Sequence, residues 1–221
     1  MRQTTQIDVV TSTHGKVLVH AGSGGELRLL VGFHGYAQNA AEMLAELRGV
    51  DAAAEWTIAS VQALHRFYRG RSEVTVASWM TREDRQLLID DNVAYIDRVV
   101  AQVANGRAIE RLVFCGFSQG VAMAFRAAVR GRHRTDLVLA LGGDVPPELL
   151  DDPAARFPRT LLARGAHDQF FGAAGHDRDT VRLRERGALV EQLVFEGGHE
   201  WTDEFRLTAA RLLTESALPA Q

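Results

Sequence analysis

The stretch that most constrains the fold covers residues 111–131 and reads RLVFCGFSQGVAMAFRAAVRG. Near its start, residues 112–115 are all apolar, a run typical of a strand that is buried on both faces. Residues 119–130 have a helical pattern rich in small residues, and Gly131 follows as a helix-ending residue. A buried strand therefore passes into a helix through a very short turn.

That turn reads Gly116-Phe117-Ser118-Gln119-Gly120, a G-x-S-x-G pattern. In a nucleophile elbow, the serine occupies a strained strand-to-helix turn that presents its hydroxyl above the sheet. The flanking positions must be glycine because side chains there would collide with the neighbouring strand and helix. The pattern alone is weak, but its setting between a strand and a helix is the one that an elbow needs. The sequence therefore predicts that Ser118 is a nucleophile, with a tight structural turn as the alternative.

Segments with strand and helix patterns alternate along the rest of the chain. We expect strands at residues 26–33, 56–61, 137–141, 160–163 and 189–195, after an antiparallel start formed by IDVV and KVLVH within residues 6–20. We expect helices at residues 39–49, 81–105, 176–186 and 201–215, and an arginine- and aromatic-rich loop before Met80. Asn39, with Glu42 three residues on, forms a capping box for the first of these helices. The alternation predicts an α/β fold, one domain over residues 1–221, with a mostly parallel sheet and helices on both faces.

Composition narrows the class of protein. With 46% hydrophobic and 24% charged residues, the chain is typical of a globular protein, and its net charge of −3 gives no indication of binding to nucleic acid or an anionic membrane. No apolar run approaches the ~20 residues of a membrane span. A single cysteine, Cys115, excludes an internal disulfide, and the first residues lack the pattern of a signal peptide. We therefore expect a cytoplasmic protein, with a homodimer left open.

Four motifs come directly after expected strands: HGY, GFSQG, GAHD and GGH. In mostly parallel sheets, ligands bind beyond the carboxyl ends of the strands. Because parallel strands present these ends at the same edge, the four motifs should converge there. This agreement is stronger evidence for a site than any one motif.

The residues at that edge fit nucleophilic catalysis. A serine hydroxyl needs a base, usually a histidine oriented by a carboxylate, and in elbow-type enzymes the chain order is serine, acid, histidine. Asp168 lies 50 residues after Ser118, and His199 lies 31 residues further on. We predict Asp168 as the acid and His199 as the base, with Asp144 as the alternative acid because it also follows a strand.

Attack on an acyl carbon creates an oxyanion that needs prearranged N–H donors. The backbone N–H of Gln119, at the start of the elbow helix, is one candidate. The other should come from the loop after the upstream strand, and we predict the N–H of Tyr36. The alternative for His34-Gly35 is a plain turn at the end of a strand.

The segments FHGYAQNA, FCGFSQG, GAHD and FEGGHEWT, in this order and spacing, resemble the phospholipase/carboxylesterase family of α/β-hydrolases, the group with acyl-protein thioesterases and small carboxylesterases. The resemblance extends over nearly the whole chain. It implies an α/β-hydrolase fold, no cofactor, and hydrolysis of carboxylic esters or thioesters. It also implies Ser118, Asp168 and His199 as the catalytic residues and Tyr36 and Gln119 as the oxyanion donors. Two departures, Val121 after the elbow and GAHDQFF without a proline after the aspartate, concern loop geometry and substrate.

The substrate is less constrained by the sequence. Aromatic side chains near the expected edge could line an acyl pocket, and Trp79 and Phe170 are the main candidates, with Phe171 and Trp201 beside them. Arg66, Arg69 and Arg71 could bind a carboxylate or phosphate, although a solvated loop is the simpler interpretation. No H-E-x-x-H or C-x-x-C spacing indicates a metal.

Two other classes of function remain open. One is a peptidase or amidase with the same residues, which would turn over an amide faster than any ester. The other is a non-catalytic binding module on the same scaffold, which would fail to react with a serine-directed fluorophosphonate.

Overall fold

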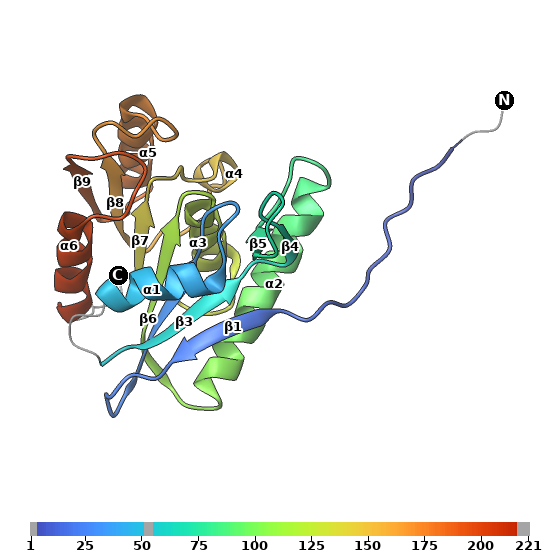
Figure 1. Cartoon of the computed structure of the whole chain (residues 1–221). Coiled ribbons are helices and arrows are strands. Elements are labelled where there is room, and N and C mark those ends of the chain that lie inside the picture. The colour runs from blue at the N-terminus through green and yellow to red at the C-terminus, as the bar shows by residue number, and fades with distance from the viewer. Residues whose placement is uncertain (1–3, 51–54, 216–221) are drawn as a thin grey trace.

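The computed structural model describes residues 4–50 and 55–215 and shows a central sheet flanked by helices (Figure 1). Seven strands form the sheet: β1 (Lys16–His20), β2 (Leu27–Phe33), β3 (Thr57–Gln62), β6 (Ile109–Phe117), β7 (Leu137–Leu141), β8 (Arg159–Gly165) and β9 (Val190–Phe195). A hairpin of β4 (His65–Tyr68) and β5 (Thr75–Ser78) stands apart from it. The helices are α1 (Ala40–Val50), α2 (Arg85–Ala104), α3 (Gln119–Arg130), α4 (Pro147–Leu150), α5 (Ala173–Glu185) and α6 (Asp203–Thr214).

The sheet has the order β1-β3-β2-β6-β7-β8-β9. β1 pairs antiparallel with β3, and all other neighbours in this sheet are parallel. The predicted mostly parallel sheet is therefore confirmed. It places the carboxyl ends of β2, β6, β7, β8 and β9 at one edge, where the four motifs follow their strands.

Helices cover both faces of the sheet, as predicted. One core contains residues of α2, α3 and α5, and the other contains residues of α1 and α6. Strand β6 supplies both cores: Leu112 and Phe114 face the first, and Val113 and Cys115 face the second. Because successive side chains of a strand point to opposite faces, a central strand covered on both sides must be apolar throughout.

Two local expectations were wrong, and one short helix was not predicted. The IDVV segment is not a strand: Ile7, Val9 and Val10 are exposed, and the segment extends away from the sheet (Figure 1). It has strand-like residues but no neighbouring strand to complete its hydrogen bonds. The expected loop before Met80 contains the β4-β5 hairpin, and the short helix α4 was not expected.

The remaining expectations agree closely with the structure. Helix α5 begins three residues before the expected 176, at Ala173. The capping box is present, since Asn39 Oδ1 accepts from the N–H of Ala41 and Glu42 at 3.0 Å, and Glu42 accepts from Asn39 N–H at 2.9 Å.

One domain over residues 1–221 stays a prediction, and residues 1–3, 51–54 and 216–221 lie outside the described residues. Among the helices of residues 4–50 and 55–215, none has the length and apolar character needed to cross a bilayer.

Candidate active site

Ser118 stands at the turn between β6 and α3 in a strained backbone conformation. Its φ is 54° and its ψ is −121°, a region that residues other than glycine rarely adopt. The turn is held by a hydrogen bond from Ser118 N–H to the carbonyl of Leu141, 2.9 Å long, which joins it to the end of β7. Such a conformation costs on the order of 1–3 kcal/mol and persists only where the surroundings impose it.

The two glycines of the motif are required by close packing of the backbone. A Cβ atom on Gly116 would lie 2.5 Å from the carbonyl oxygen of Gly120 in α3. A Cβ atom on Gly120 would lie 2.0 Å from the carbonyl oxygen of Phe33 at the end of β2. The helix therefore starts directly against two strand ends, which gives the sharp turn that the sequence predicts.

Asp168 and His199 contact each other. His199 Nδ1 lies 2.8 Å from Asp168 Oδ2, and the carboxylate is fully buried. The other oxygen, Oδ1, accepts hydrogen bonds from the N–H groups of Phe170 at 2.8 Å and Phe171 at 2.9 Å. With Oδ1 engaged by two N–H donors, Oδ2 faces the imidazole, and the carboxylate therefore has a fixed orientation.

The pairing of β8 with β9 continues into the loops that carry these two residues. Ala166 N–H donates to the carbonyl of Phe195 at 2.8 Å, and His167 N–H donates to that of Gly197 at 2.9 Å. A Cβ atom on Gly165 would lie 2.2 Å from the carbonyl oxygen of Gly198. The acid loop and the base loop are thus one hydrogen-bonded unit.

The alternative acid and the other downstream histidines lie elsewhere. Asp144 is exposed. His133 Nε2 lies 3.2 Å from the carbonyl oxygen of Asp97, and His167 pairs with Glu196 at 2.7 Å on the surface. Of the two aspartates that the sequence left open, Asp168 is therefore the one that contacts His199.

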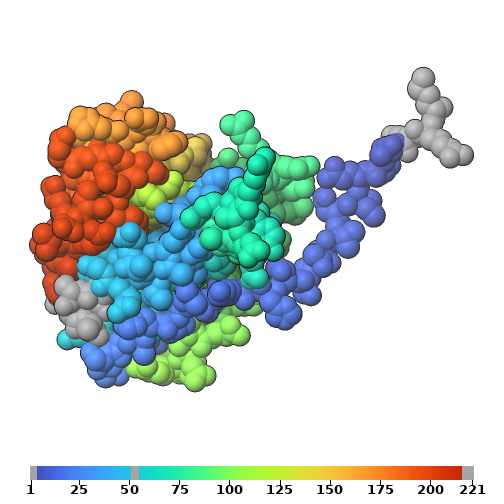
Figure 2. All heavy atoms as spheres, in the orientation of Figure 1, coloured from blue at the N-terminus to red at the C-terminus, as the bar shows by residue number. Residues whose placement is uncertain are grey.

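Aromatic rings enclose the imidazole of His199. The ring of Phe117 and the ring of Phe170 each have their centroid 4.9 Å from it, and Trp201 packs against Phe117. Phe117 is the residue before Ser118, so the elbow itself forms one wall of the histidine site. In the space-filling view, yellow-green atoms of the chain near residue 120 are visible in a hollow between the orange and red C-terminal segments and the blue segment that contains α1 (Figure 2). Ser118 is half-buried, with part of its surface open to solvent.

The loop after β2 adjoins the serine. A Cβ atom on Gly35 would lie 3.3 Å from Ser118 Cβ and 3.2 Å from the ring of Phe117. Tyr36, the next residue, is 62% exposed and packs its ring against Phe67 of the hairpin. The backbone of this loop therefore passes directly beside the elbow.

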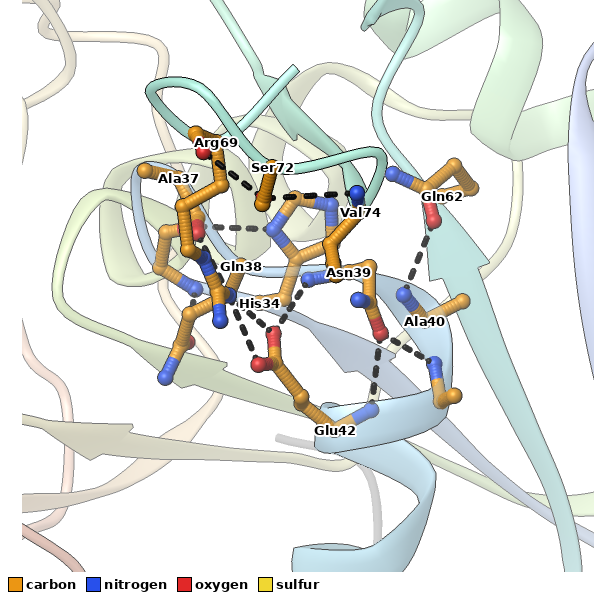
Figure 3. Close-up of polar contacts among 12 residues, drawn as sticks. His34, Ala37, Gln38, Asn39, Ala40, Glu42, Gln62, Arg69, Ser72 and Val74 are labelled. Atoms are coloured by element: carbon orange, nitrogen blue, oxygen red, sulfur yellow. Dashed lines mark hydrogen bonds and ion pairs between the residues drawn. The ribbon is translucent and has the colours of Figure 1, made fainter. Parts of the chain in front are cut away.

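Nearly every N–H of this loop has an acceptor. Gly35 donates to Gln38 Oε1 at 2.7 Å, Ala37 to the carbonyl of Ala77 at 3.1 Å, and Gln38 to the carbonyl of Gly35 at 3.2 Å. Figure 3 shows the polar contacts that surround the loop. Within residues 4–50 and 55–215, the N–H groups of Tyr36 and Gln119 have no acceptor. Both predicted oxyanion donors are therefore free to bind a ligand.

The side chain of Gln119 ties the elbow to the end of the hairpin. Its Oε1 accepts from Trp79 N–H at 3.0 Å, and its Nε2 donates to the carbonyl of Met80 at 3.1 Å. It also contacts the hydroxyl of Ser78. Gln119 thus combines a free backbone donor with a side chain that fixes the segment following β5.

His34 is a buried structural residue. Its Nδ1 lies 2.7 Å from the carbonyl oxygen of Gly35, and its Nε2 accepts from Ala63 N–H at 3.1 Å. This arrangement requires the neutral imidazole with its proton on Nδ1. Burial lowers the pKa of His34, partly offset by the hydrogen bond to Gly35.

Trp79 does not line a pocket, contrary to our expectation. It is completely buried, its indole N–H donates to the carbonyl of His34 at 2.8 Å, and its ring packs on Phe33 and His34. Trp79 lies near the sheet edge as expected, but its side chain points into the core, where a substrate has no access. Phe170, in contrast, is 82% exposed.

The three arginines have different surroundings. Arg66 donates to the carbonyl of His14, and Arg69 binds Glu42 and the carbonyl of Ala37. Arg71 is exposed, and its side chain has no hydrogen-bond or ion-pair partner in the part of the chain that the structure describes. Sequence reasoning missed the Arg69 contacts and the part played by Phe117, since neither belongs to a motif. Among the described residues, no group of three or more histidine, cysteine or acidic side chains could hold a metal ion.

Comparison with known protein families agrees with the resemblance seen in the sequence. A sequence model of the phospholipase/carboxylesterase family matches residues 73–158, which include the elbow. A search of curated protein sequences found no significant match.

Solved structures share the fold at low sequence identity. A carboxylesterase from Mesorhizobium loti is 17% identical with a TM-score of 0.74, and the match covers 95% of this chain and 99% of that one. Esterase PE8 is 21% identical with a TM-score of 0.73, over 91% and 98% of the two chains. Acyl-protein thioesterase 2 from Zea mays is 19% identical with a TM-score of 0.70, also over 91% and 98%. These comparisons confirm the α/β-hydrolase fold and the resemblance to the phospholipase/carboxylesterase family, by sequence over residues 73–158 and by fold over more than nine tenths of the chain.

Proposed function

We propose that this protein is a serine hydrolase that cleaves carboxylic esters or thioesters through an acyl-enzyme. The observation that carries the proposal is the 2.8 Å contact between His199 Nδ1 and Asp168 Oδ2. The imidazole of His199 also packs on Phe117, the residue before the strained Ser118. The family match over the elbow supports the class of reaction.

The base is His199. Because its Nδ1 proton is donated to the Asp168 carboxylate, its Nε2 is the basic nitrogen. Nε2 removes the proton of the Ser118 hydroxyl as the serine oxygen attacks the acyl carbon. The buried carboxylate stabilises the imidazolium that forms and itself stays ionised.

The attack produces a tetrahedral intermediate with a negative oxygen, which the N–H groups of Tyr36 and Gln119 bind. Both groups lack a protein acceptor among the described residues and adjoin the serine in sequence or in space. The imidazolium then protonates the leaving alcohol or thiol as the bond to the acyl carbon breaks. A water molecule, activated by the same imidazole, hydrolyses the acyl-enzyme and regenerates the serine.

Phe170 supports a substrate with an apolar part. Its ring packs on His199 and is 82% exposed, so it offers apolar surface directly beside the reacting atoms. The expected location is the cytoplasm, in keeping with a single cysteine that is buried. Association into a homodimer stays a prediction that a measurement of molar mass in solution would test.

The proposal is tested with the purified protein and its Ser118→Ala variant. Nitrophenyl esters of graded acyl length, a thioester and a nitroanilide are compared, and each protein is treated with a fluorophosphonate probe. We expect ester or thioester turnover and probe labelling in the wild type and neither in the variant. Faster turnover of the anilide would assign an amidase, and absence of labelling in the wild type would reject the hydrolase assignment.

A further inference from the structure

Arg69 joins the β4-β5 hairpin to the loop that carries Tyr36. It directly follows β4, and its Nη2 lies 2.9 Å from the carbonyl oxygen of Ala37. The same nitrogen contacts both carboxylate oxygens of Glu42, at 2.7 and 2.9 Å. Figure 3 shows the guanidinium between the loop and the first turn of α1. One cation of the hairpin therefore bridges the loop and the start of α1, about 30 residues earlier in the chain.

The segment that Arg69 contacts is strained. Ala37 has a φ of 57°, in the left-handed region that residues with a Cβ adopt at a cost. Both of its backbone polar groups are held by the hairpin, the N–H by the carbonyl of Ala77 and the carbonyl by Arg69. The next residue, Gln38, accepts a hydrogen bond from Ala77 N–H at 2.9 Å. The hairpin thus holds three of the four backbone polar groups of Ala37 and Gln38, the two residues after Tyr36.

Glu42 contributes to the same arrangement from the helix. One of its oxygens accepts from Asn39 N–H at 2.9 Å while it binds Arg69, so the start of α1, the end of the loop and the hairpin are linked through one carboxylate. On the other side of Tyr36, the N–H of Gly35 is bound by Gln38 Oε1. The residues on both sides of Tyr36 are fixed, whereas its own N–H is left without an acceptor in the described chain.

We propose that Arg69, paired with Glu42, is a positioning residue that holds the peptide of Tyr36 so that its N–H points at the oxyanion. This inference rests on the proposed function and deepens it. Arg69 does not touch the reacting atoms; it acts through the Ala37 carbonyl on the conformation of the preceding residue. Prearranged donors are effective because they need no reorganisation during the reaction. A looser loop should therefore reduce the stabilisation of the transition state more than the binding of the substrate.

The experiment compares Arg69→Met with Arg71→Met in the full chain. Arg71 lies two residues away in the same turn and is exposed without a polar partner among the described residues, which makes it a matched control. The readouts are kcat, KM, the pH–rate profile, and the affinity for a trifluoromethyl ketone, which adds to the serine and places an oxyanion in the hole. We expect Arg69→Met to lower kcat by about tenfold or more, less than the loss of a whole donor. KM and the acid limb of the profile should stay unchanged, while ketone affinity falls by the same factor as kcat.

Two further variants separate this role from general stability. In Arg69→Lys, a single nitrogen replaces Nη2, the atom that makes all three contacts, so we expect a rate within about threefold of the wild type. Glu42→Gln keeps an oxygen for Asn39 N–H and removes the charge, so kcat should fall without loss of helix α1. If Arg69→Met does not fold, Glu42→Gln carries the test.

Several outcomes would overturn the proposal. It fails if kcat and ketone affinity in Arg69→Met, or in Glu42→Gln where the first does not fold, stay within about twofold of the wild type. It also fails if Arg71→Met loses as much activity, or if the acid limb moves, because the effect would then not belong to the oxyanion loop. These results leave the proposed function intact. Absence of turnover and of Ser118 labelling in the wild type would reject the proposed function, and this inference with it.

Discussion

Nδ1 of His199 lies 2.8 Å from Oδ2 of Asp168, while the other oxygen of that carboxylate accepts two backbone N–H groups. The two N–H donors leave the carboxylate only one way to face the imidazole. The side-chain amide of an asparagine at position 168 would be oriented in the same way, and its effect on turnover can be measured.

In Asp168→Asn, the amide oxygen should remain with the N–H groups of Phe170 and Phe171, which turns the amide NH₂ toward His199. The NH₂ donates to Nδ1 and moves the imidazole proton to Nε2, so the base is lost. We expect turnover to fall by about 10²-fold or more; the equivalent change in a serine protease costs about 10⁴. The control is Asp144→Asn, an exposed position where the rate should change little. A larger loss in Asp144→Asn would reassign the acid.

Ser118→Gly should be more stable than Ser118→Ala. Both remove the hydroxyl, but only glycine adopts a φ of 54° with a ψ of −121° without strain. We expect a difference in the free energy of unfolding of about 1 kcal/mol or more, measured by urea denaturation. Equal stabilities would mean that the elbow is not strained.

Phe170→Ala should discriminate between substrates. The exposed ring of Phe170 is expected to pack on the acyl or leaving group, so its removal should lower kcat/KM more for long or aromatic esters than for acetates. The ratio of kcat/KM values across nitrophenyl esters of increasing length measures this. An equal loss of kcat/KM for all esters would instead indicate that the ring of Phe170 orients His199 and does not contact the substrate.

Stability should depend on the protonation of His34. Burial lowers the pKa of this imidazole in the folded protein, so the unfolded chain binds a proton first as the pH falls. The free energy of unfolding therefore decreases as the pH drops below the unfolded value, about 6.5. Burial raises the pKa of Asp179, which acts in the opposite direction at lower pH, so the wild type is compared with His34→Gln. The wild type should lose more stability between pH 7.5 and 5.5, and parallel curves would contradict this.

The alternation of strands and helices, and the convergence of the loops after the strands, could be predicted from the sequence because both follow from local patterns. The apolar run before Ser118 indicates a central strand, and the glycines around it indicate where backbones touch. The contact of Asp168, rather than Asp144, with His199 required the structure, because it depends on which loop lies next to His199.

Other features depend on contacts that a linear sequence does not contain. Trp79 lies near the sheet edge as expected, but the direction of its side chain depends on its packing against Phe33 and His34. The β4-β5 hairpin lacks an apolar alternation, and Arg69 fastens it to Glu42 from a distant segment. The IDVV segment shows the reverse case, a strand-like sequence without a neighbouring strand.

The continuous pairing of β8 with β9 has a consequence for how activity is lost. β9 is an edge strand, so it can separate from the sheet while the strands around β6 stay paired. Such a partial opening would withdraw His199 from the elbow, because the loop that carries it continues the backbone ladder that joins β9 to β8. Low urea concentrations should therefore abolish turnover while circular dichroism still reports most of the secondary structure. Amide hydrogens of β9 should then exchange with solvent earlier than those of β6. The local stability of this edge strand, rather than the global stability of the fold, would then determine when activity is lost.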